Sequence, residues 1–483
     1  MEDWQIMEDT PIILCEYGET VTVTNVDDSN ITHITIPNSV TKIGDWAFRE
    51  CTNLTNIVIG NSVTKIGYYA FEGCSSLQSI DIPNSVTSIG DCAFGDCSSL
   101  QNINVSEDNP NYTLINGVLF KKELSTIIKL PAKKELEVYN IPNDVKTIGS
   151  GAFEGCSSLQ SIDIPNSVTT IGYCAFEGCS SLQRITIPNS ITTIEERVFV
   201  DCSSLQSIDI PKSITAIEKG AFWGCSALES IDIPDSVTTI GKNAFSDCSS
   251  LQSIDIPNSV TTIGNYAFRG CSSLQSIDIP NSVTTIGYCA FEGCSSLQRI
   301  TIPNSITTIK ERAFVDCSSL QSIDIPNSVT TIGRCAFEGC SSLQKINVSN
   351  SNEYFVSINN ILFNKKQSSI IRMPLGTAIK KFHIPTSVLT INPHAFCCCR
   401  LLEGIYIHKD INTIGDYAFN KCNSLKSIHT SIIEIENVNI SKSAFDGIDT
   451  DNCILHVPPG TRWAYRHHPV FGKFKNIEIE KQE

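Results

Sequence analysis

Apolar side chains recur along this chain at intervals of 23 residues. In one representative unit, the apolar positions are Leu251, Ile254, Ile256, Val260, Ile263, Ala267, Phe268 and Cys271. One coil of this length cannot bury all of these side chains, but stacked coils bury them against one another. A sustained period of this size is typical of repeat proteins. The pattern therefore predicts a solenoid of short coils, which we call rungs.

The order of residues within a unit predicts its local structure. The alternation of Ile254 and Ile256 indicates a short strand that faces the core on one side. Pro257 ends this strand because proline has no N–H group to donate to a neighbouring strand. The spacing of Ala267 and Cys271 predicts a single helical turn. Each rung is therefore expected to contain a strand, a return leg and a short turn.

The repeat pattern also predicts the domain organisation. The solenoid is expected to cover residues 31–430, with about 17 rungs between Ile36 and Thr430. Residues 1–30 and 431–483 lack the full pattern. Because the two ends of a solenoid would otherwise expose its core, we expect these segments to be caps.

Two rungs are longer than the others, at residues 105–141 and 348–384. The Ala–Phe pairs that flank each of them are 59 residues apart instead of 23. Asn116-Gly117 and Asn359-Asn360 stand at the same position in the two rungs, between apolar runs. These dipeptides predict β-hairpins with tight primed turns.

The longer rungs also carry pairs of basic residues, namely Lys121 and Lys122 in the first and Lys365 and Lys366 in the second. One interpretation is that these lysines keep an exposed strand edge soluble. The other is that the hairpins are projecting binding elements with positive tips.

The repeat L-x-x-I-x-I-P-x-x-V-x-x-I-x-x-x-A-F-x-x-C, from about Ile31 to Cys422, resembles the BspA-like leucine-rich repeat family. The segment CILHVPPGTRWAYRHHPVFGKFKNI, residues 453–477, is similar to the closing unit of such proteins. The resemblance implies a right-handed leucine-rich repeat solenoid of a bacterial protein, on the cell surface or secreted. It also implies adhesion through host or matrix proteins, or through other cells.

Charge and hydropathy narrow the range of partners and locations. The chain has 35 basic and 51 acidic residues, a net charge of −16, so we expect no binding to nucleic acid. No apolar run is long enough to span a membrane. Residues 1–19 have no basic start, and PIILC is too short for a signal-peptide core. A cytoplasmic location is therefore the alternative to the cell surface.

One outward position of the strand forms an acidic column. Its members include Asp209, Asp232, Asp255 and Asp278. Arg184 and Arg299 stand beside threonines of the same column and bracket the aspartates. The column is either a solvated strip or a site for a basic partner or a cation such as calcium. These six residues and the four hairpin lysines are the candidate binding residues.

The chain contains 22 cysteines, most of them at one inward position of the repeat. Free cysteine acts there as a small hydrophobic residue, so we expect buried thiols and no disulfide framework. The sequence His394-Ala-Phe-Cys397-Cys398-Cys399 is the one cluster of metal-type ligands. A structural zinc site needs four ligands, usually as two spaced pairs, and no second pair is evident. We therefore predict no metal and no cofactor.

The sequence favours a binding protein over an enzyme. The longer rungs contain no G-x-S-x-G, phosphate-loop or H-E-x-x-H motif. Residues 156–178 and 271–293 are identical, and such copying lengthens a surface without new folding rules. We predict a non-catalytic protein with a protein partner on a cell surface. The alternatives are an intracellular interaction scaffold and a glycan-binding module.

Overall fold

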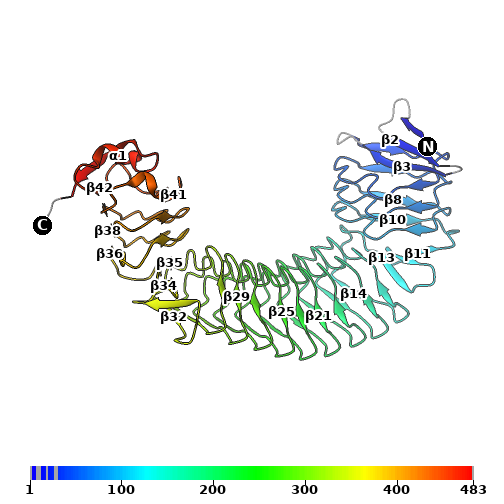
Figure 1. Ribbon diagram of the computed structural model, residues 1–483. Helices are drawn as coiled ribbons and strands as arrows, with labels where there is room; N and C mark the ends of the chain where they lie inside the picture. Colours follow the sequence, from blue (N-terminus) through cyan, green and yellow to red (C-terminus); the bar gives the residue numbers. More distant parts are fainter. Residues whose placement is uncertain (1–2, 7–11, 18–19, 27–30, 481–483) are drawn as a thin grey trace. The chain divides into compact units, whose positions relative to one another are not determined.

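The computed structural model describes residues 3–6, 12–17, 20–26 and 31–480. The chain divides into two compact units, Met1–Leu251 and Gln252–Glu483, called here the N-terminal and C-terminal units. Within each unit, short parallel strands stack in columns, one strand above the next (Figure 1). Each unit is thus built from rungs that pair mainly with the rungs before and after them.

The first column of strands contains the Ile-x-Ile segment of each repeat. In the N-terminal unit its members are β4 (His33–Thr35), β6 (Asn56–Val58), β8 (Ser79–Ile82), β10 (Asn102–Val105), β14 (Val138–Asn140), β16 (Ser161–Asp163), β18 (Arg184–Thr186), β20 (Ser207–Asp209) and β22 (Ser230–Asp232). In the C-terminal unit they are β24 (Ser253–Asp255), β26 (Ser276–Asp278), β28 (Arg299–Thr301), β30 (Ser322–Ile325), β32 (Lys345–Val348), β36 (Lys381–His383), β38 (Gly404–Ile407), β40 (Ser427–Thr430), β42 (Ile454–Val457) and β43 (Asn476–Ile479). Up to β40, the described residues hold nine and eight such strands, which confirms the predicted 17 rungs.

The second column contains the return leg of each repeat, usually a Thr–Ile pair. In the N-terminal unit its members are β5 (Lys42–Ile43), β7 (Lys65–Ile66), β9 (Ser88–Ile89), β15 (Thr147–Ile148), β17 (Thr170–Ile171), β19 (Thr193–Ile194), β21 (Ala216–Ile217) and β23 (Thr239–Ile240). In the C-terminal unit they are β25 (Thr262–Ile263), β27 (Thr285–Ile286), β29 (Thr308–Ile309), β31 (Thr331–Ile332), β37 (Thr390–Ile391), β39 (Thr413–Ile414) and β41 (Asn439–Ile440). The isoleucines of both columns point into the rung, where they form the core with Leu, Val, Phe and Cys side chains.

The Ala–Phe segment forms a third side of each rung. The sequence predicts a helical turn there, and the structure has a series of hydrogen-bonded turns without a continuous helix. In one rung, Tyr69 (φ 55°) and Gly73 (φ 75°) flank Phe71 in the left-handed conformation. A right-handed helix cannot continue through such residues. Their conformation turns backbone N–H groups toward the next rung, so that Phe71 N donates to Ala93 O at 2.8 Å.

Stacked phenylalanines fill the centre of the rungs. The rings of Phe291 and Phe314 are buried, with centroids 5.5 Å apart and planes within 5° of parallel. Similar pairs repeat along each unit, including Phe176 with Phe199 at 5.6 Å. The repeat therefore aligns one aromatic side chain per regular rung into apolar stacks.

The cysteine that follows each phenylalanine is a hydrogen-bond donor as well as an apolar residue. Cys225 Sγ donates to Phe199 O, in the preceding rung, at 3.1 Å. The same bond joins Cys74 to Phe48, Cys97 to Phe71, Cys179 to Phe153, Cys202 to Phe176, Cys248 to Phe222, Cys294 to Phe268, Cys317 to Phe291, Cys340 to Phe314 and Cys422 to Phe396. The prediction that these thiols are buried is confirmed. The thiol is a second donor to the carbonyl, since Phe199 O, for example, also accepts from Cys202 N at 3.2 Å.

The two longer rungs contain the predicted hairpins. In the first, β11 (Tyr112–Ile115), β12 (Val118–Lys121) and β13 (Thr126–Lys129) form an antiparallel meander, and β13 then joins β15 of the second column. In the second, β33 (Phe355–Ile358), β34 (Ile361–Asn364) and β35 (Ser369–Arg372) do the same beside β37. Both residues of each turn dipeptide have positive φ, as primed turns require.

Each longer rung lacks an Ala–Phe turn and places a buried basic side chain there instead. Lys129 is 3% exposed, and its Nζ donates to Gly151 O at 2.8 Å and to Glu154 O at 3.1 Å. Arg372 is 5% exposed and donates to His394 O and, at 3.3 Å, to Phe337 O. Gly151 O and His394 O also accept from Glu154 N and Cys397 N, so the basic side chains add a second donor there and donate as well to Glu154 O and Phe337 O.

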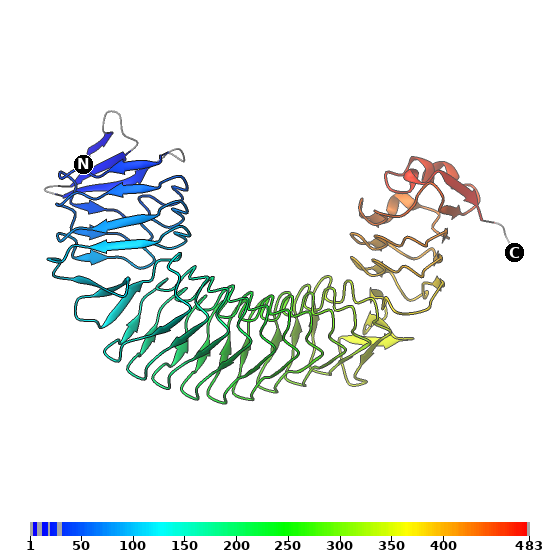
Figure 2. The ribbon, with the colours of Figure 1, turned by 180° about the vertical axis from the view of Figure 1, so that it is seen from behind.

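The ends of the two units differ from the regular rungs. The predicted cap at residues 1–30 lies partly outside the described residues; its described part contains β1 (Asp3–Ile6), β2 (Ile12–Tyr17) and β3 (Thr20–Val26), with β3 parallel to β5. The C-terminal segment contains η1 (Ile435–Asn437), α1 (Arg462–His467) and η2 (Phe471–Lys473) (Figure 2). In it, the buried Tyr465 donates its hydroxyl to Ile432 O at 2.9 Å. None of the helices in the described residues could cross a membrane.

We predict that Cys225→Ala lowers the free energy of unfolding by about 0.5–1.5 kcal/mol, because Phe199 O keeps the N–H of Cys202 at 3.2 Å but loses its second donor. Cys225→Ser, which keeps a donor, should cost less than Cys225→Ala. Urea denaturation of the two variants measures the difference. A more stable alanine variant would show that only the apolar character of the thiol matters.

A second prediction concerns Glu154, whose pKa is raised to about 7 because burial penalises the charged carboxylate, although the charge of Lys129 offsets part of this effect. Since the folded state holds this proton more tightly, the stabilising contribution is complete below the ordinary pKa of 4.5 and is lost as pH rises through 7. We expect Glu154→Gln to stabilise the protein against urea at pH 8 and to change little at pH 5. The exposed Glu107→Gln is the control, and an equal effect of Glu154→Gln at both pH values would contradict the prediction.

Candidate binding face

The strand face of the C-terminal unit carries a column of stacked rings. His383, Tyr406, His429 and His456 occupy the same register on β36, β38, β40 and β42. Successive ring centroids are 3.9, 4.2 and 4.3 Å apart, and the ring planes are within 10° of parallel. Because neighbouring parallel strands lie about 4.8 Å apart, side chains in register can stack in this way. The column is a flat aromatic surface that extends over four rungs.

Hydrogen bonds at the edge of the column fix the orientation of its rings. His429 Nδ1 lies 3.0 Å from Glu480 Oε2, and His429 Nε2 lies 3.1 Å from Ser427 Oγ. A carboxylate only accepts hydrogen bonds, so Nδ1 of His429 is the donor to Glu480. In a neutral His429, Nε2 then accepts a hydrogen bond from the Ser427 hydroxyl. The next rung continues the polar edge, since Glu478 of β43 is in register with His456.

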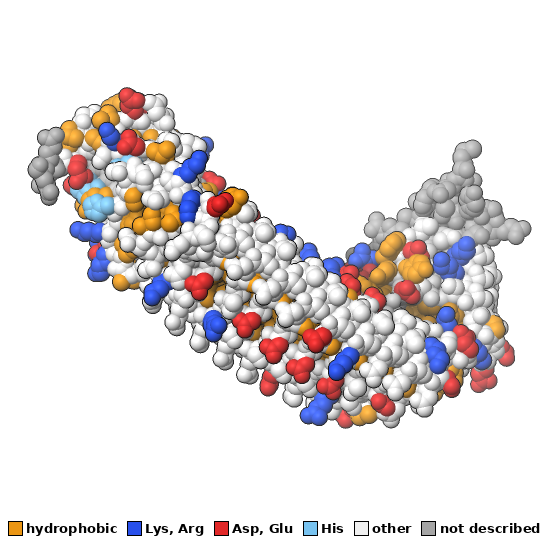
Figure 3. Space-filling view, turned by 60° about the horizontal axis from the view of Figure 1, so that its bottom comes forward, with side chains coloured by type: hydrophobic (Ala, Val, Ile, Leu, Met, Phe, Trp, Pro, Cys, Tyr) orange, Lys and Arg blue, Asp and Glu red, His pale blue; other side chains and the backbone are white. Residues whose placement is uncertain are grey.

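A groove of about 390 Å³ runs along the column. Its lining includes three of the four rings, His383, Tyr406 and His429, together with Glu480. His383 is exposed, and the other rings of the column are half-buried by their neighbours. In the space-filling view, histidine side chains gather near the C-terminal end of the chain, beside hydrophobic side chains (Figure 3). A ligand could therefore contact both ring surfaces and hydrogen-bonding groups at this place.

The ring column is poorly suited to hold a metal ion. One ligand atom each of His429, His456 and Glu480 lies within 4.8 Å of the others. However, the lone pairs of imidazole lie in the ring plane, and the planes of His429 and His456 are 9° from parallel. Stacked rings direct these lone pairs side by side and not toward one point. The arrangement therefore favours contacts with the ring faces and edges.

Burial also affects the charge of one ring of the column, His456. The pKa of His456 is lowered mainly because burial penalises the imidazolium and also because His429 is close, while Glu480 and Glu478 act in the opposite direction. His456 is thus held in a less charged state than a free histidine would be.

The aspartates predicted from the sequence lie at the corresponding outward position of their strands. In the N-terminal unit, Asp209 is exposed at the end of β20, and Thr186 of β18 is in register with it. In the C-terminal unit, Asp278 is exposed in register with Thr301. Asp232 and Asp255 are exposed at the ends of β22 and β24. Among the described residues, no ion pair occupies these four carboxylates, so they remain open to a partner.

The predicted basic residues are also exposed. Arg184 and Arg299 begin β18 and β28, where each is in register with a serine of a neighbouring strand. The hairpin lysines, Lys121, Lys122, Lys365 and Lys366, lie at or just after the ends of β12 and β34. Within the described part of the chain, no ion pair joins these lysines to the aspartates. The structure therefore places the ten predicted residues on the surface but does not gather them into one site.

Sequence reasoning missed the ring column, although a signal was present. His383, Tyr406, His429 and His456 occupy the same repeat position as the aspartates, at the second outward residue of the strand. The substitution of rings for carboxylates in consecutive rungs is readable from the sequence. Their parallel stacking and the contact with Glu480 depend on the fold.

The fold and its faces define a class of protein: a leucine-rich repeat solenoid with open strand faces. The family model described as BspA type leucine rich repeat region (6 copies) matches residues 25–135, 129–252, 238–370 and 354–456. These matches cover most of the chain, and the protein belongs to this family. The resemblance to this family that was inferred from the repeat sequence is therefore confirmed.

Solved structures of similar bacterial proteins exist. A leucine-rich repeat protein from Bacteroides ovatus is 27% identical over 89% of this chain and 98% of its own, with a TM-score of 0.42. A leucine rich cell surface protein from Faecalibacterium prausnitzii is 26% identical over 90% of this chain and 97% of its own, with a TM-score of 0.40. No curated protein matches the chain.

The lowered pKa of His456 gives a testable pH dependence. Its neutral form is favoured by folding, so its contribution to stability is present above the ordinary pKa of 6.5 and is lost as pH falls through the lowered value. Between pH 8 and pH 5, the melting temperature of His456→Gln should therefore fall less than that of the unaltered protein. The exposed His33→Gln in the N-terminal unit is the control. Identical pH profiles for the unaltered protein and His456→Gln would contradict the prediction.

Proposed function

We propose that the protein is a non-catalytic binding protein of the bacterial cell surface that holds a protein partner on its strand faces and serves in adhesion. The observation that carries this proposal is the ring column in the C-terminal unit, exposed at His383 and half-buried at the other rings, with the groove along it. Repeat proteins of BspA type are generally surface and interaction modules, which supports the same reading.

The chemistry of the faces suits a protein partner. Aromatic side chains are enriched among the residues that dominate protein–protein binding, because they bury a large area with little loss of conformational freedom. The exposed aspartates add a negative field that speeds the approach of a basic partner and that salt screens. We expect Tyr406 to contribute most to the affinity for the partner and the aspartates to raise the rate of association.

The hydrogen bonds around His429 resemble a Ser–His–Glu relay, but the backbone around it argues against catalysis. An acyl-transfer site needs free N–H groups that stabilise the oxyanion. The N–H of Ser427 donates to Glu403 O at 3.2 Å, and its neighbours Ile428 and His429 belong to the paired strand β40. Since these donors are engaged, Ser427 and Glu480 orient the imidazole rather than activate a nucleophile.

A binding experiment tests the proposal. Purified protein is applied to immobilised extracellular matrix proteins and to cultured host cells. Tyr406→Ala should weaken binding by tenfold or more, about 1.4 kcal/mol or above. The exposed Thr284→Ala, distant in sequence from the ring column, is the matched control. Unchanged binding by a folded Tyr406→Ala variant would remove the ring column from the interface.

Two further measurements separate the alternatives. Sugar rings also stack on flat aromatic surfaces, so the ring column allows a glycan partner as a second candidate. Competition by free sugars would support the glycan, while loss of binding in high salt supports a charged protein partner. Protease treatment of intact producing cells tests the location. Full protection of the protein, alongside a protected cytoplasmic control, would favour the intracellular scaffold.

A further inference from the structure

The second longer rung leaves a gap in the column of Ala–Phe turns in the C-terminal unit. In a regular rung, a phenylalanine N–H donates to the alanine carbonyl of the next turn. Here Met373 N donates instead, to Ala395 O at 2.8 Å. Because the longer rung has no Ala–Phe turn of its own, the turn at residues 335–339 lies next to the turn at residues 394–398.

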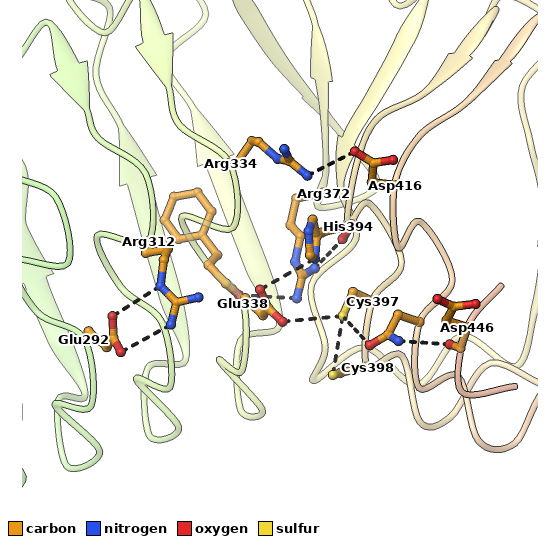
Figure 4. A network of polar contacts seen from close by, with 12 residues as sticks. Glu292, Arg312, Arg334, Glu338, Arg372, His394, Cys397, Cys398, Asp416 and Asp446 are labelled. Atoms are coloured by element: carbon orange, nitrogen blue, oxygen red, sulfur yellow. Dashed lines mark hydrogen bonds and ion pairs between the residues drawn. The ribbon is translucent and has the colours of Figure 1, made fainter. Parts of the chain in front are cut away.

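Four side chains from these two turns lie at the gap, and Figure 4 shows three of them, Glu338, His394 and Cys397. One ligand atom each of Cys335, Glu338 and His394 lies within 4.8 Å of the other two. His394 Nδ1 is 3.6 Å from Glu338 Oε2, and Cys397 Sγ is 3.6 Å from Glu338 Oε1. In a tetrahedral zinc site with bonds of about 2.0 to 2.3 Å, donor atoms lie roughly 3.3 to 3.8 Å apart. The two contacts of Glu338 fall within these distances, and Cys335 lies within 4.8 Å of Glu338 and His394. Cys397 lies outside this group of three and approaches it at Glu338.

One of the donors has no other function in the structure. His394 Nδ1 is buried and has no hydrogen-bond partner. A buried polar atom without a partner is costly and needs an explanation. A bound cation next to Nδ1 would supply one.

We propose that Cys335, Glu338, His394 and Cys397 form a binding site for a divalent metal ion of the zinc type. Thiolate and imidazole donors suit Zn²⁺, and a carboxylate completes a mixed ligand set. The ion would bridge the two turns across the gap, where the stack of phenylalanines is interrupted.

The charges in the gap support this assignment. Two thiolates and one carboxylate carry three negative charges. A divalent ion supplies two positive charges, and the buried guanidinium of Arg372 supplies the third. Arg372 donates to His394 O and to Phe337 O, so it also fixes the spacing of the two turns that carry the ligands. Such supporting contacts are a regular feature of metal sites.

The site has a path from solvent. A groove of about 740 Å³ is lined by Glu338 and Cys398, among other residues. On the inner side, a cavity of about 90 Å³ is lined by Cys335, Arg372 and His394. An ion could enter from the groove and reach its ligands without unfolding of the rung.

The first longer rung is an internal control. Cys92 corresponds to Cys335, but Gly95, Gly151 and Glu154 stand where the second rung has Glu338, His394 and Cys397. In that rung, Glu154 lies 3.8 Å from the buried Lys129. Lacking the imidazole and the second thiol, it should not bind zinc.

The proposed metal ligands are far apart in the sequence. Cys335-x-x-Glu338 and His394-x-x-Cys397 are two spaced pairs, 59 residues apart. The absence of an evident second pair led to the expectation of no metal. The stacking of the rungs brings the second pair next to the first, because the residues between the two pairs form the longer rung.

Cobalt(II) titration of the reduced, metal-free full-length protein tests the proposal. Tetrahedral thiolate ligation should give intense visible bands and a sulfur-to-cobalt charge-transfer band at one equivalent. Zn²⁺ should then displace Co²⁺ and raise the melting temperature. Cys335→Ser and His394→Ala should each weaken binding by at least tenfold, whereas Cys92→Ser in the first longer rung should bind as the unaltered protein does.

Two further variants make the assignment falsifiable. Cys398 Sγ lies 3.6 Å from Cys397 Sγ and is the neighbouring thiol. Loss of the charge-transfer band in Cys397→Ser but not in Cys398→Ser supports the assigned ligand, and the reverse result overturns it. His429→Ala must keep the cobalt spectrum, since a loss there would assign the ion to the ring column. No stoichiometric Co²⁺ binding by the folded protein would overturn the proposal, and circular dichroism establishes that each variant is folded.

Discussion

Each rung of this protein depends on its neighbours for its hydrogen bonds. The Ile-x-Ile and Thr–Ile strands are two to four residues long, and the Ala–Phe turns direct N–H groups along the stack. The carbonyl of a stacked phenylalanine accepts from an N–H of its own turn and also from a cysteine thiol of the next rung. The inward cysteine therefore adds one more bond between rungs. A buried polar group must find a partner, and the short strands find theirs in the adjacent rung.

The longer rungs show what happens where this constraint cannot be met by repetition. A missing turn leaves a gap in the column, and a lysine in one case and an arginine in the other reach into it and donate to carbonyl groups of the neighbouring turns. A carboxyl group lies beside each of these buried cations. Glu154 is 3.8 Å from Lys129, and Glu338 with its neighbouring thiols lies near Arg372. The same defect in the repeat thus leads to an ion pair in one rung and to a group of metal-type ligands in the other.

Much of the fold could be read from the sequence, because the repeat fixes which side chains face inward. The period, the strand at Ile254, the hairpin turns at Asn116 and Asn359 and the buried thiols all follow from local pattern. The turn around Phe71 could not be read in this way. Its spacing matches a helix, while the left-handed residues that interrupt the helix vary in type. Likewise, contacts such as Cys335 with His394 depend on the path of an entire longer rung.

The identical segments 156–178 and 271–293 present identical surfaces to whatever rung folds against them. A chain of such segments contains many near-equivalent ways to stack out of register during folding, each almost as favourable as the native one. The longer rungs break this degeneracy. Lys129 donates to Gly151 O and Glu154 O, and Arg372 donates to His394 O and Phe337 O, so a shifted alignment would bury an unpaired charge. These two buried cations therefore specify the register in which the rungs pair, because one alignment of each unit is far more favourable than the shifted alignments.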